Sequence, residues 1–570
     1  MTGTLLPGTV AGDVLAPVRD FDRFLGDASD PSAVISTERS IELDERSEFP
    51  TDTVAAVDAW GLQRYYVPAE YGGLLTDAIA PLLMIRHLAR RDVTAAVAHG
   101  KTFLGSVCAW VVGGDIAARM AAIAVTGDPV SWGLTERGGG SDLSHGTTAA
   151  HIADRGIRVE GTKWPINNAS RGRAMTVLAR TDQRHGPRSL SLVLVDKHEI
   201  DAATITYERK VATHGIRGAD ISGIRFRSTT VDSANLVGPV GHGLEIVLKS
   251  LQLTRPLTTG LSLGAADQGL AIALEFADTR RLYGRRLAEL PGARRVLAEA
   301  VADTLLAEVV MFAGVRSAHE TPAEMSLVSA LVKFLGAETV DLLFRDLTHF
   351  VGARSQLVGV AGAGAFQKAA RDNRVVGIFD GNSIVNLHVI VNEFGNMTRD
   401  GNPPDLDAVL AVLRPGYADR LPTSALRLVS RHGSSMLRAL PGLVDMLEAK
   451  GASVAALAPA RRIAADYRAL LDEAADLPRQ SQPDPLAFHL AERFALTFGA
   501  ACAVAFWLAR RGSIHGPLSR DDAWLAAVLQ RLSFRLGGDP IDNDVAYAVT
   551  EAALEARTSG VVTLLSDWLG

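Results

Sequence analysis

The sequence predicts an α+β protein that is mostly helical and carries one small antiparallel β domain between helical domains. Apolar residues recur at helical spacing up to about residue 128, and short β-branched runs separated by turn residues follow to about residue 240. Helical spacing then returns. Because the chain has 570 residues, it is too long for a single hydrophobic core. We therefore expect four domains, at residues 1–128, 129–240, 241–400 and 401–570.

The expected elements follow the chain in that order. Pro50 and Thr51 are typical residues for a helix start, and the Asp400-to-Pro404 segment is the expected linker before the last domain. A segment rich in proline, glutamine and serine, residues 477–485, interrupts that domain. The expected helices cover residues 51–60, 77–91, 95–112, 258–287, 294–318 and 324–347, and the expected strands cover residues 156–160, 174–180, 189–195 and 223–227.

Composition excludes several classes of protein. The net charge of −6 gives no basic footprint for nucleic acid. The two cysteines, Cys108 and Cys502, lie far apart and predict neither a disulfide framework nor a metal site. The N-terminus lacks a secretory signal, and the longest uncharged apolar stretch, residues 494–509, is shorter than the roughly 20 residues that cross a bilayer. We expect a cytoplasmic protein without a transmembrane segment, and the alanine- and arginine-rich composition suggests a bacterial source.

Asp380 and Gly381 form the first candidate for chemistry. They place a short carboxylate beside a flexible backbone position, just after a basic segment at residues 367–374. A fixed carboxylate can remove a proton from a carbon acid when a hydride acceptor lies nearby. An Asp-Gly pair is also a common turn sequence, so the pair alone leaves both interpretations open.

The glycine-rich stretch of residues 131–142 is the second candidate. Its glycines allow close approach of a flat ligand, and Thr135 and Ser141 offer hydroxyl groups. A surface turn is the alternative, and a Rossmann fingerprint is excluded because no βαβ unit surrounds the stretch. The stretch resembles T-E-P-x-A-G-S-D of the acyl-CoA dehydrogenase family. That resemblance implies that Leu134, Thr135, Gly140 and Ser141 contact a flavin, with Ser141 also beside the thioester substrate.

Residues 161–169 resemble the family sequence G-x-K-x-W-I-T-N-G. Ile166 matches, Asn167 replaces the threonine, and both are expected to contact the flavin. Pro165 occupies the place of the tryptophan, and Trp164 comes one residue early. Because alternate residues of a strand face opposite sides, Trp164 would point away from the flavin unless the register differs locally. A core position for Trp164 is the alternative.

Arg280 and Tyr283 match the family pattern R-x-x-F-G. A guanidinium can pair with pyrophosphate oxygens, and in the family this arginine reaches the flavin of a neighbouring subunit. The resemblance therefore implies a homodimer or homotetramer, whereas a solvated helix end is the alternative. Arg255 matches a substrate-site arginine of the family, and its neighbour Thr254 is not acidic, so a second base position is empty.

The last matching segment contains the catalytic position. Where the family reads Q-x-x-G-G, this chain has His349 in place of glutamine and keeps the first glycine as Gly352. Where the family reads Y-E-G-T, Asp380 stands at the catalytic glutamate and Asn382 at the threonine. We expect His349 to serve as a hydrogen-bond partner, although a catalytic acid or base is also open.

The resemblance covers about residues 40–395 and implies the family fold: an N-terminal helical domain, a middle β domain and a C-terminal four-helix bundle. Residues 401–570 would add a helical domain, placed like the one appended to the very-long-chain members. The implied cofactor is FAD, with no metal. The implied substrate is an acyl thioester on coenzyme A or acyl carrier protein, from fatty acid or secondary metabolism, and electrons would leave to electron-transfer flavoprotein or another acceptor.

The implied reaction is α,β-dehydrogenation, in which Asp380 is the general base, the β-hydride passes to flavin N5 and Gly381 leaves room for the thioester. Two alternatives stay open. One is a flavoenzyme of the same fold with oxygen-dependent hydroxylase or oxidase chemistry. The other is a non-catalytic scaffold, because several expected flavin contacts differ from the family. The altered positions are Pro165, Asn167, Pro291, His349 and Asn382.

Overall fold

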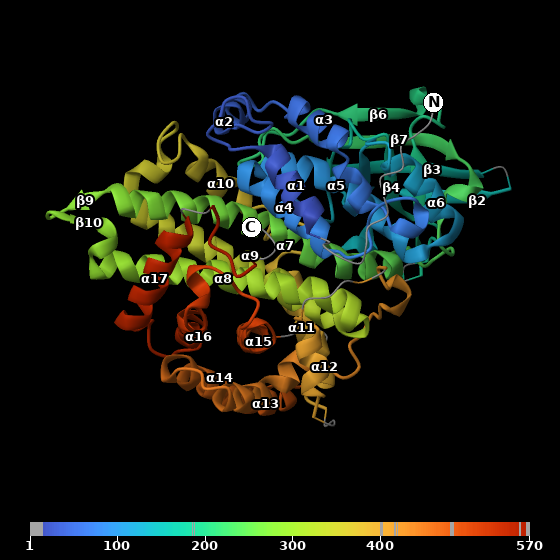
Figure 1. Ribbon diagram of the computed structural model, residues 1–570. Helices are drawn as coiled ribbons and strands as arrows, with labels where there is room; N and C mark the ends of the chain where they lie inside the picture. The colour runs from blue at the N-terminus through green and yellow to red at the C-terminus, as the bar shows by residue number, and fades with distance from the viewer. Residues whose placement is uncertain are drawn as a thin grey trace.

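The computed structural model describes residues 15–565 except 155, 185, 187, 400–402, 415–417, 419, 479–483 and 558–559. N-terminal helices, a β-sheet, a bundle of long helices and a further group of helices follow one another along the chain (Figure 1). The predicted fold class is therefore confirmed. The linker predicted at residues 400–404 and the interruption predicted at residues 477–485 lie partly outside the described residues.

Helix α5 is the N-terminal helix that matters most for the site. It begins after Asp92, whose side chain accepts hydrogen bonds from the amides of Thr94 at 2.7 Å and Ala95 at 3.2 Å. Near its middle, Gly105 lies so close to the sheet that an added Cβ would come within 2.4 Å of the Val130 carbonyl oxygen. The N-terminal helices are α1 (Ala16–Leu25), α2 (Thr37–Arg46), α3 (Thr51–Trp60), α4 (Ile79–Arg91), α5 (Val93–Val112) and α6 (Gly114–Ala124).

The strands form an eight-stranded sheet in the order β6-β7-β3-β2-β4-β5-β8, with β1 beside β4. Most neighbours are antiparallel as predicted, but β1 runs parallel to β4, with Val130 opposite Ala174. Buried apolar residues fill both faces of β4 and β5. The strands are β1 (Val130–Gly133), β2 (Ala149–Ala153), β3 (Gly156–Asn167), β4 (Ala174–Arg180), β5 (Leu190–Asp196), β6 (Ile205–Glu208), β7 (Ile221–Val231) and β8 (Leu236–Val237).

Long helices form the bundle that follows the sheet. The helix predicted at residues 258–287 ends earlier, at Thr279, and this part of the prediction is wrong. A hairpin of β9 (Arg281–Leu282) and β10 (Arg285–Arg286) replaces its last turns, because Tyr283 and Gly284 adopt left-handed φ values of 53° and 78°. The bundle helices are α7 (Gly243–Thr279), α8 (Pro291–Glu320), α9 (Met325–Val351), α10 (Ala365–Asn373) and α11 (Ser383–Met397).

The added helices lie below the bundle in the view of Figure 1. Helix α15 is at their centre and packs against α8, α9, α11 and α13. Both α5 and α15 are long and apolar enough to cross a membrane, but 67% and 89% of their most apolar windows are buried inside the protein. The added helices are α12 (Leu406–Ala411), α13 (Ser435–Ala449), α14 (Val454–Ala475), α15 (Pro485–Arg510), α16 (Ala523–Arg535) and α17 (Asn543–Arg557).

Buried ion pairs fasten the added helices to the bundle. Arg531 of α16 pairs with Asp303 of α8 at 2.9 Å and with Asp346 of α9 at 3.3 Å. The segment after α17 reaches the main core, where the Leu564 amide donates to Glu308 at 2.7 Å. Because Glu308 also pairs with Arg86 of α4, the last described residues are tied to the N-terminal helices. The added helices and the described residues 560–565 are therefore packed into the body of the protein.

Candidate active site

A cavity of about 930 Å³ lies where the sheet meets helices α5, α7 and α11. That volume is at the upper end of the range for small-molecule and cofactor sites. Its walls are mostly apolar, and the polar groups come from a few short segments. The predicted site residues that line it are Leu134, Thr135, Gly140, Ser141, Ile166, Asn167, Arg255, Asp380, Gly381 and Asn382.

The cavity therefore brings together segments that are far apart in the sequence. The loop after β1 supplies residues 134–135 and 140–144, the end of β3 supplies residues 165–167, and the turn before α11 supplies residues 378–382. Arg255 comes from the middle of α7. The sheet and the helical bundle therefore both contribute to its walls.

Asp380 lies in a turn with left-handed φ values of 56° at Asp380 and 96° at Gly381. Its Oδ2 atom is buried without a hydrogen-bond partner among the described residues, and its backbone amide likewise donates to none of them. An unpartnered buried carboxylate oxygen costs free energy, so a missing ligand is the natural partner. Glycine suits position 381 because a φ of 96° strains other residues, and an added Cβ would also lie 3.2 Å from the Arg255 guanidinium.

Neighbouring side chains hold this turn in place. Arg255 Nε donates to the Asp380 carbonyl oxygen at 3.1 Å, and Asn386 Nδ2 donates to the Gly381 carbonyl oxygen at 2.7 Å. Asn382 Oδ1 accepts a hydrogen bond from the Val385 amide at 2.9 Å and thereby caps α11. The oxygen of Asn382 is thus used by the helix, which leaves its amide nitrogen for a ligand.

Three cationic side chains act on Asp380. Burial lowers the pKa of Arg255 to about 10, while the charge of Asp380 raises it. Burial also lowers the pKa of Lys333 to about 8, and its ammonium lies over the Phe379 ring at 4.7 Å and donates to the Val376 carbonyl. Lys101 of α5 lines the cavity. Among the described residues, none of the three cations forms an ion pair. Positive charge therefore exceeds negative charge around Asp380.

The loop after β1 is fixed by its own contacts. Thr135 Oγ1 donates to the Pro165 carbonyl at 3.0 Å. Burial raises the pKa of Glu136, but the charge of Lys163 and hydrogen bonds from Lys163 and Thr147 lower it to about 2. Lys163 Nζ lies 2.7 Å from Glu136. Glu136 is therefore a structural anchor of this loop.

Pro165, not Trp164, lines the cavity. The register between β3 and β7 shifts between Lys163 and Ile166, and Trp164 lies under the Arg137 guanidinium at 4.2 Å. The indole does not line the cavity, the register does shift locally, and Trp164 is partly buried, so it is not a core residue. Asn167 donates to the Val97 carbonyl at 3.1 Å, while its Oδ1 atom is buried without a partner among the described residues.

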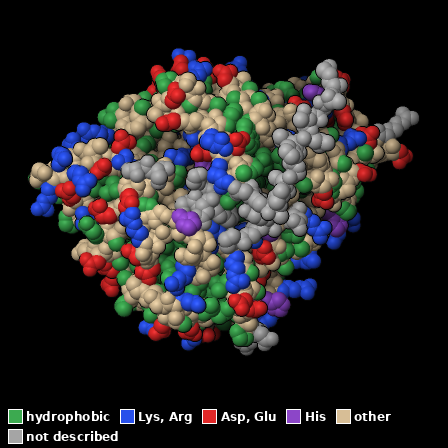
Figure 2. All heavy atoms as spheres, in the orientation of Figure 1, with side chains coloured by type: hydrophobic (Ala, Val, Ile, Leu, Met, Phe, Trp, Pro, Cys, Tyr) green, Lys and Arg blue, Asp and Glu red, His purple; other side chains and the backbone are tan. Residues whose placement is uncertain are grey.

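The remaining predicted cofactor residues, Arg280, Tyr283, His349 and Gly352, do not line the cavity of their own chain. Arg280 follows α7, and the rise of 1.5 Å per residue places the end of that helix about 36 Å from Arg255. Tyr283 is 93% exposed at the tip of the hairpin. Lys and Arg side chains gather at this end of the molecule, at the left of Figure 2. Within one chain, Arg280 and Tyr283 therefore cannot contact the same reacting atoms as the residues that line the cavity.

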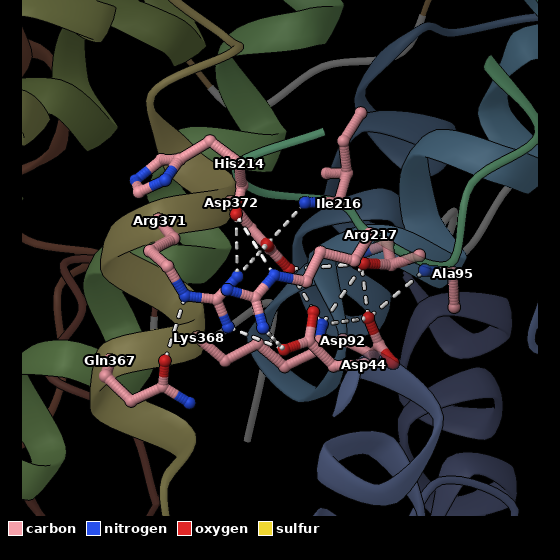
Figure 3. Close-up of polar contacts among 11 residues, drawn as sticks. Asp44, Asp92, Ala95, His214, Ile216, Arg217, Gln367, Lys368, Arg371 and Asp372 are labelled. Atoms are coloured by element: carbon pink, nitrogen blue, oxygen red, sulfur yellow. Dashed lines mark hydrogen bonds and ion pairs between the residues drawn. The ribbon is translucent and has the colours of Figure 1, made fainter. Parts of the chain in front are cut away.

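An ionic cluster next to the cavity joins α2, α5 and α10 to the loop of residues 213–217 (Figure 3). Lys368 Nζ lies 2.8 Å from Asp92 and 2.7 Å from Asp372. Asp372 also accepts the Ile216 amide at 2.6 Å, and Arg371 reaches Asp44 at 2.5 Å. Because His214 and Arg371 also line the cavity, this cluster sets the position of one of its edges.

Lys101 and Lys333 are the site residues that the motifs did not single out. Each is the only charged side chain over several turns of an apolar helix. That isolation is the feature of the sequence that could have marked them as site residues. Arg371 and Asp372, which belong to the basic segment before Asp380, are members of the ionic cluster. Its members hold the fold around the cavity.

Comparisons with known proteins match the same parts of the chain. The profile of the acyl-CoA dehydrogenase N-terminal domain matches residues 34–112, the middle-domain profile matches residues 131–229, and the C-terminal-domain profile matches residues 241–394. Together they span more than half of the chain. A relative named "Probable acyl-CoA dehydrogenase FadE25", from Mycobacterium tuberculosis, is 24% identical over 342 residues, which cover 60% of this chain and 86% of the relative.

Solved structures share the fold. An acyl-CoA dehydrogenase complexed with FAD from Bacillus anthracis superposes with a TM-score of 0.71 at 18% identity, and the match covers 95% of this chain and 94% of that one. It therefore includes the added helices. The prolyl acyl carrier protein oxidase AnaB superposes with a TM-score of 0.61 at 17% identity over 68% of this chain and all of that one.

Proposed function

The chain belongs to the acyl-CoA dehydrogenase family and is a flavin oxidoreductase that uses FAD, and from this premise we propose that Asp380 is the general base for α,β-dehydrogenation of an acyl thioester. The observation that carries the proposal is the unpartnered, buried Oδ2 of Asp380 in the cavity wall. A carboxylate held without a partner beside a substrate-sized space is available to accept a proton.

The residues present fit the cofactor. Leu134, Thr135, Ser141 and Ile166 form a wall with two hydroxyl groups, and the buried, unpartnered Oδ1 of Asn167 would accept a hydrogen bond from a bound ring system. When bound, FAD supplies the acceptor for the hydride that leaves the β-carbon. The α-proton passes to Asp380, and a carbon–carbon double bond forms between the two carbons.

The turn also offers a group for the thioester carbonyl. The backbone amide of Asp380 has no partner among the described residues, and Gly381 keeps space open beside it. An amide aimed at the carbonyl oxygen stabilises the negative charge that develops there as the α-proton leaves. Aspartate reaches about 1.5 Å less far than glutamate, so the thioester must lie correspondingly nearer to this turn.

The far set of residues completes the site in a second copy of the chain. Arg280, Tyr283, His349 and Gly352 lie too far along the bundle to serve their own cavity, and the guanidinium of Arg280 suits a pyrophosphate. We infer a homodimer, or a homotetramer, in which these residues contact the FAD of a partner. Light scattering of wild type and of Arg280→Ala, with FAD affinity measured in parallel, tests this arrangement.

The test of the reaction uses the FAD-loaded protein without oxygen. We expect saturated acyl thioesters, carried on coenzyme A or on acyl carrier protein, to bleach the flavin and to lose two hydrogens by mass spectrometry. Electron-transfer flavoprotein or another acceptor then restores the yellow absorbance. A product that contains oxygen and forms only in air would instead favour the hydroxylase or oxidase reading, and an unchanged flavin spectrum with every thioester would contradict the proposal.

A further inference from the structure

Lys101 is a cation in the acyl cavity that the proposed reaction does not use. It lies on α5 between Gly100 and Leu104, which also line the cavity, and its ammonium is 5.9 Å from the centre of the Trp132 ring. No hydrogen bond or ion pair joins that ammonium to another of the described residues. The rest of this helix face is apolar, with Val97 one turn earlier.

An ammonium in such a place is costly without a counter-ion. Burial lowers the pKa of Lys101, and the charge of Asp380 raises it without forming an ion pair. Desolvated charges in proteins are normally paired, so the site lacks one negative group. Asp380 cannot supply it, because Arg255 and Lys333 also act on that single carboxylate.

The position of Lys101 identifies where the missing anion would lie. Leu104 and Ile85, from α5 and α4, line the same part of the cavity and suit an acyl chain. A negative group on the chain would therefore pass between apolar side chains and meet the ammonium. In the proposed function, the flavin lies against Leu134, Thr135, Ser141 and Ile166, and the thioester carbonyl lies at the turn before α11.

We propose that the cavity selects acyl groups that carry their own negative charge, with Lys101 binding a carboxylate on the acyl chain. This inference rests on the proposed function, since it assigns the substrate class of the same site. A charge-assisted hydrogen bond should give a preference of about 10- to 100-fold over an uncharged chain of the same length.

The test uses pantetheine thioethers, which contain the part shared by coenzyme A and acyl carrier protein and cannot be dehydrogenated. S-(4-carboxybutyl)-pantetheine and S-pentyl-pantetheine differ in the terminal carboxylate. Calorimetric titration of the FAD-loaded protein gives both dissociation constants. Because no chemistry occurs, the result is independent of whether Asp380 is a base, and a failure of the proposed reaction would not change it.

We expect wild type to bind the carboxylate compound about 10- to 100-fold more tightly. Lys101→Met should abolish that preference, Lys101→Arg should keep most of it, and Lys101→Glu should reverse it. Lys450→Met, which removes an exposed lysine after α13, is the matched control and should behave like wild type. Equal binding of the two compounds by wild type, no binding of either, or a preference that survives in a folded Lys101→Met would overturn the proposal.

Discussion

Lys333 and Lys368 are both buried in the helical bundle, yet they occupy opposite electrostatic settings. Lys368 lies within hydrogen-bond distance of two carboxylates, Asp92 and Asp372, and their charges raise its pKa although burial lowers it. Lys333 forms no ion pair with any described residue, and burial lowers its pKa to about 8. The cluster around Lys368 balances its charges without a ligand. The group around Asp380, with Arg255, Lys333 and Lys101, has more positive than negative charge until a ligand enters the cavity.

The difference separates structure from chemistry in this protein. The complete cluster joins α2, α5, α10 and the loop of residues 213–217, so it fixes the edge of the cavity. The incomplete cluster faces the cavity and holds Asp380, the carboxylate with an unpartnered oxygen. Removing a charge from the first should cost stability, whereas removing one from the second should change chemistry, binding or pH dependence.

The largest expected effect is on catalysis, in Asp380→Asn. The amide has the same shape but cannot take the α-proton, so the rate constant of anaerobic flavin reduction by an acyl thioester should fall about 10²- to 10⁴-fold. Stopped-flow absorbance measures it. A rate within a factor of three of wild type, with FAD still bound, would show that Asp380 is not the general base.

The next largest effect is on stability, in Lys368→Met. This change leaves Asp92 and Asp372 buried without their cation, so the free energy of unfolding should fall by about 3–5 kcal/mol. Denaturant unfolding followed by fluorescence measures the loss. Lys333→Met is the matched control on the neighbouring helix, and it should cost much less because no carboxylate loses an ion pair. Equal losses in the two variants would erase the contrast between the clusters.

A smaller effect is expected in the pH dependence of stability. The pKa of Lys333 is about 8 in the folded protein and about 10.4 in an unfolded chain, so between these values the unfolded state binds more protons. The free energy of unfolding should therefore rise with pH in this window, by roughly 1–2 kcal/mol from pH 7.5 to pH 9.5. Lys333→Met should lack this contribution, and a rise of the same size in both proteins would count against it.

The smallest effect concerns Asn382, a predicted cofactor contact whose oxygen caps α11. Asn382→Ala should lower the free energy of unfolding by about 1 kcal/mol, because the Val385 amide loses its acceptor. Asn382→Asp keeps a capping oxygen and should restore that stability. If FAD affinity falls in both variants while stability falls only in the first, the amide nitrogen of Asn382 also contacts the cofactor.

Much of the fold could be predicted because its periodicities are long and regular. The change from helical to β spacing near residue 129 and back near residue 241 is visible without any structure. The helix expected to reach residue 287 instead ends at Thr279, and a hairpin that turns at Tyr283 and Gly284 follows; its arginines resemble a polar helix end in composition and do not mark the change. The parallel pairing of β1 with β4 depends on long-range contacts that spacing does not encode.

The site was predictable where residues belong to short motifs, and less so where a single side chain matters. The segments around Ser141, Asn167 and Asp380 converge on the cavity as expected. A lone lysine in an apolar helix, such as Lys101, does not reveal from sequence which face it lies on or what it meets there. Arg280 lies far from the cavity because α7 extends 24 residues beyond Arg255 to Thr279. The sequence alone does not show where this helix ends or which way it runs from the cavity.

Proton removal can be isolated from every later step by a thioester that has α-protons but no β-carbon. In D₂O, the FAD-loaded wild type should catalyse deuterium entry into the methyl group of S-acetyl-pantetheine, and Asp380→Asn should do so at least about 100-fold more slowly. Mass spectrometry of the recovered ester gives both rates. Exchange at the same rate in the two proteins would show that the carboxylate in the cavity wall is not the base.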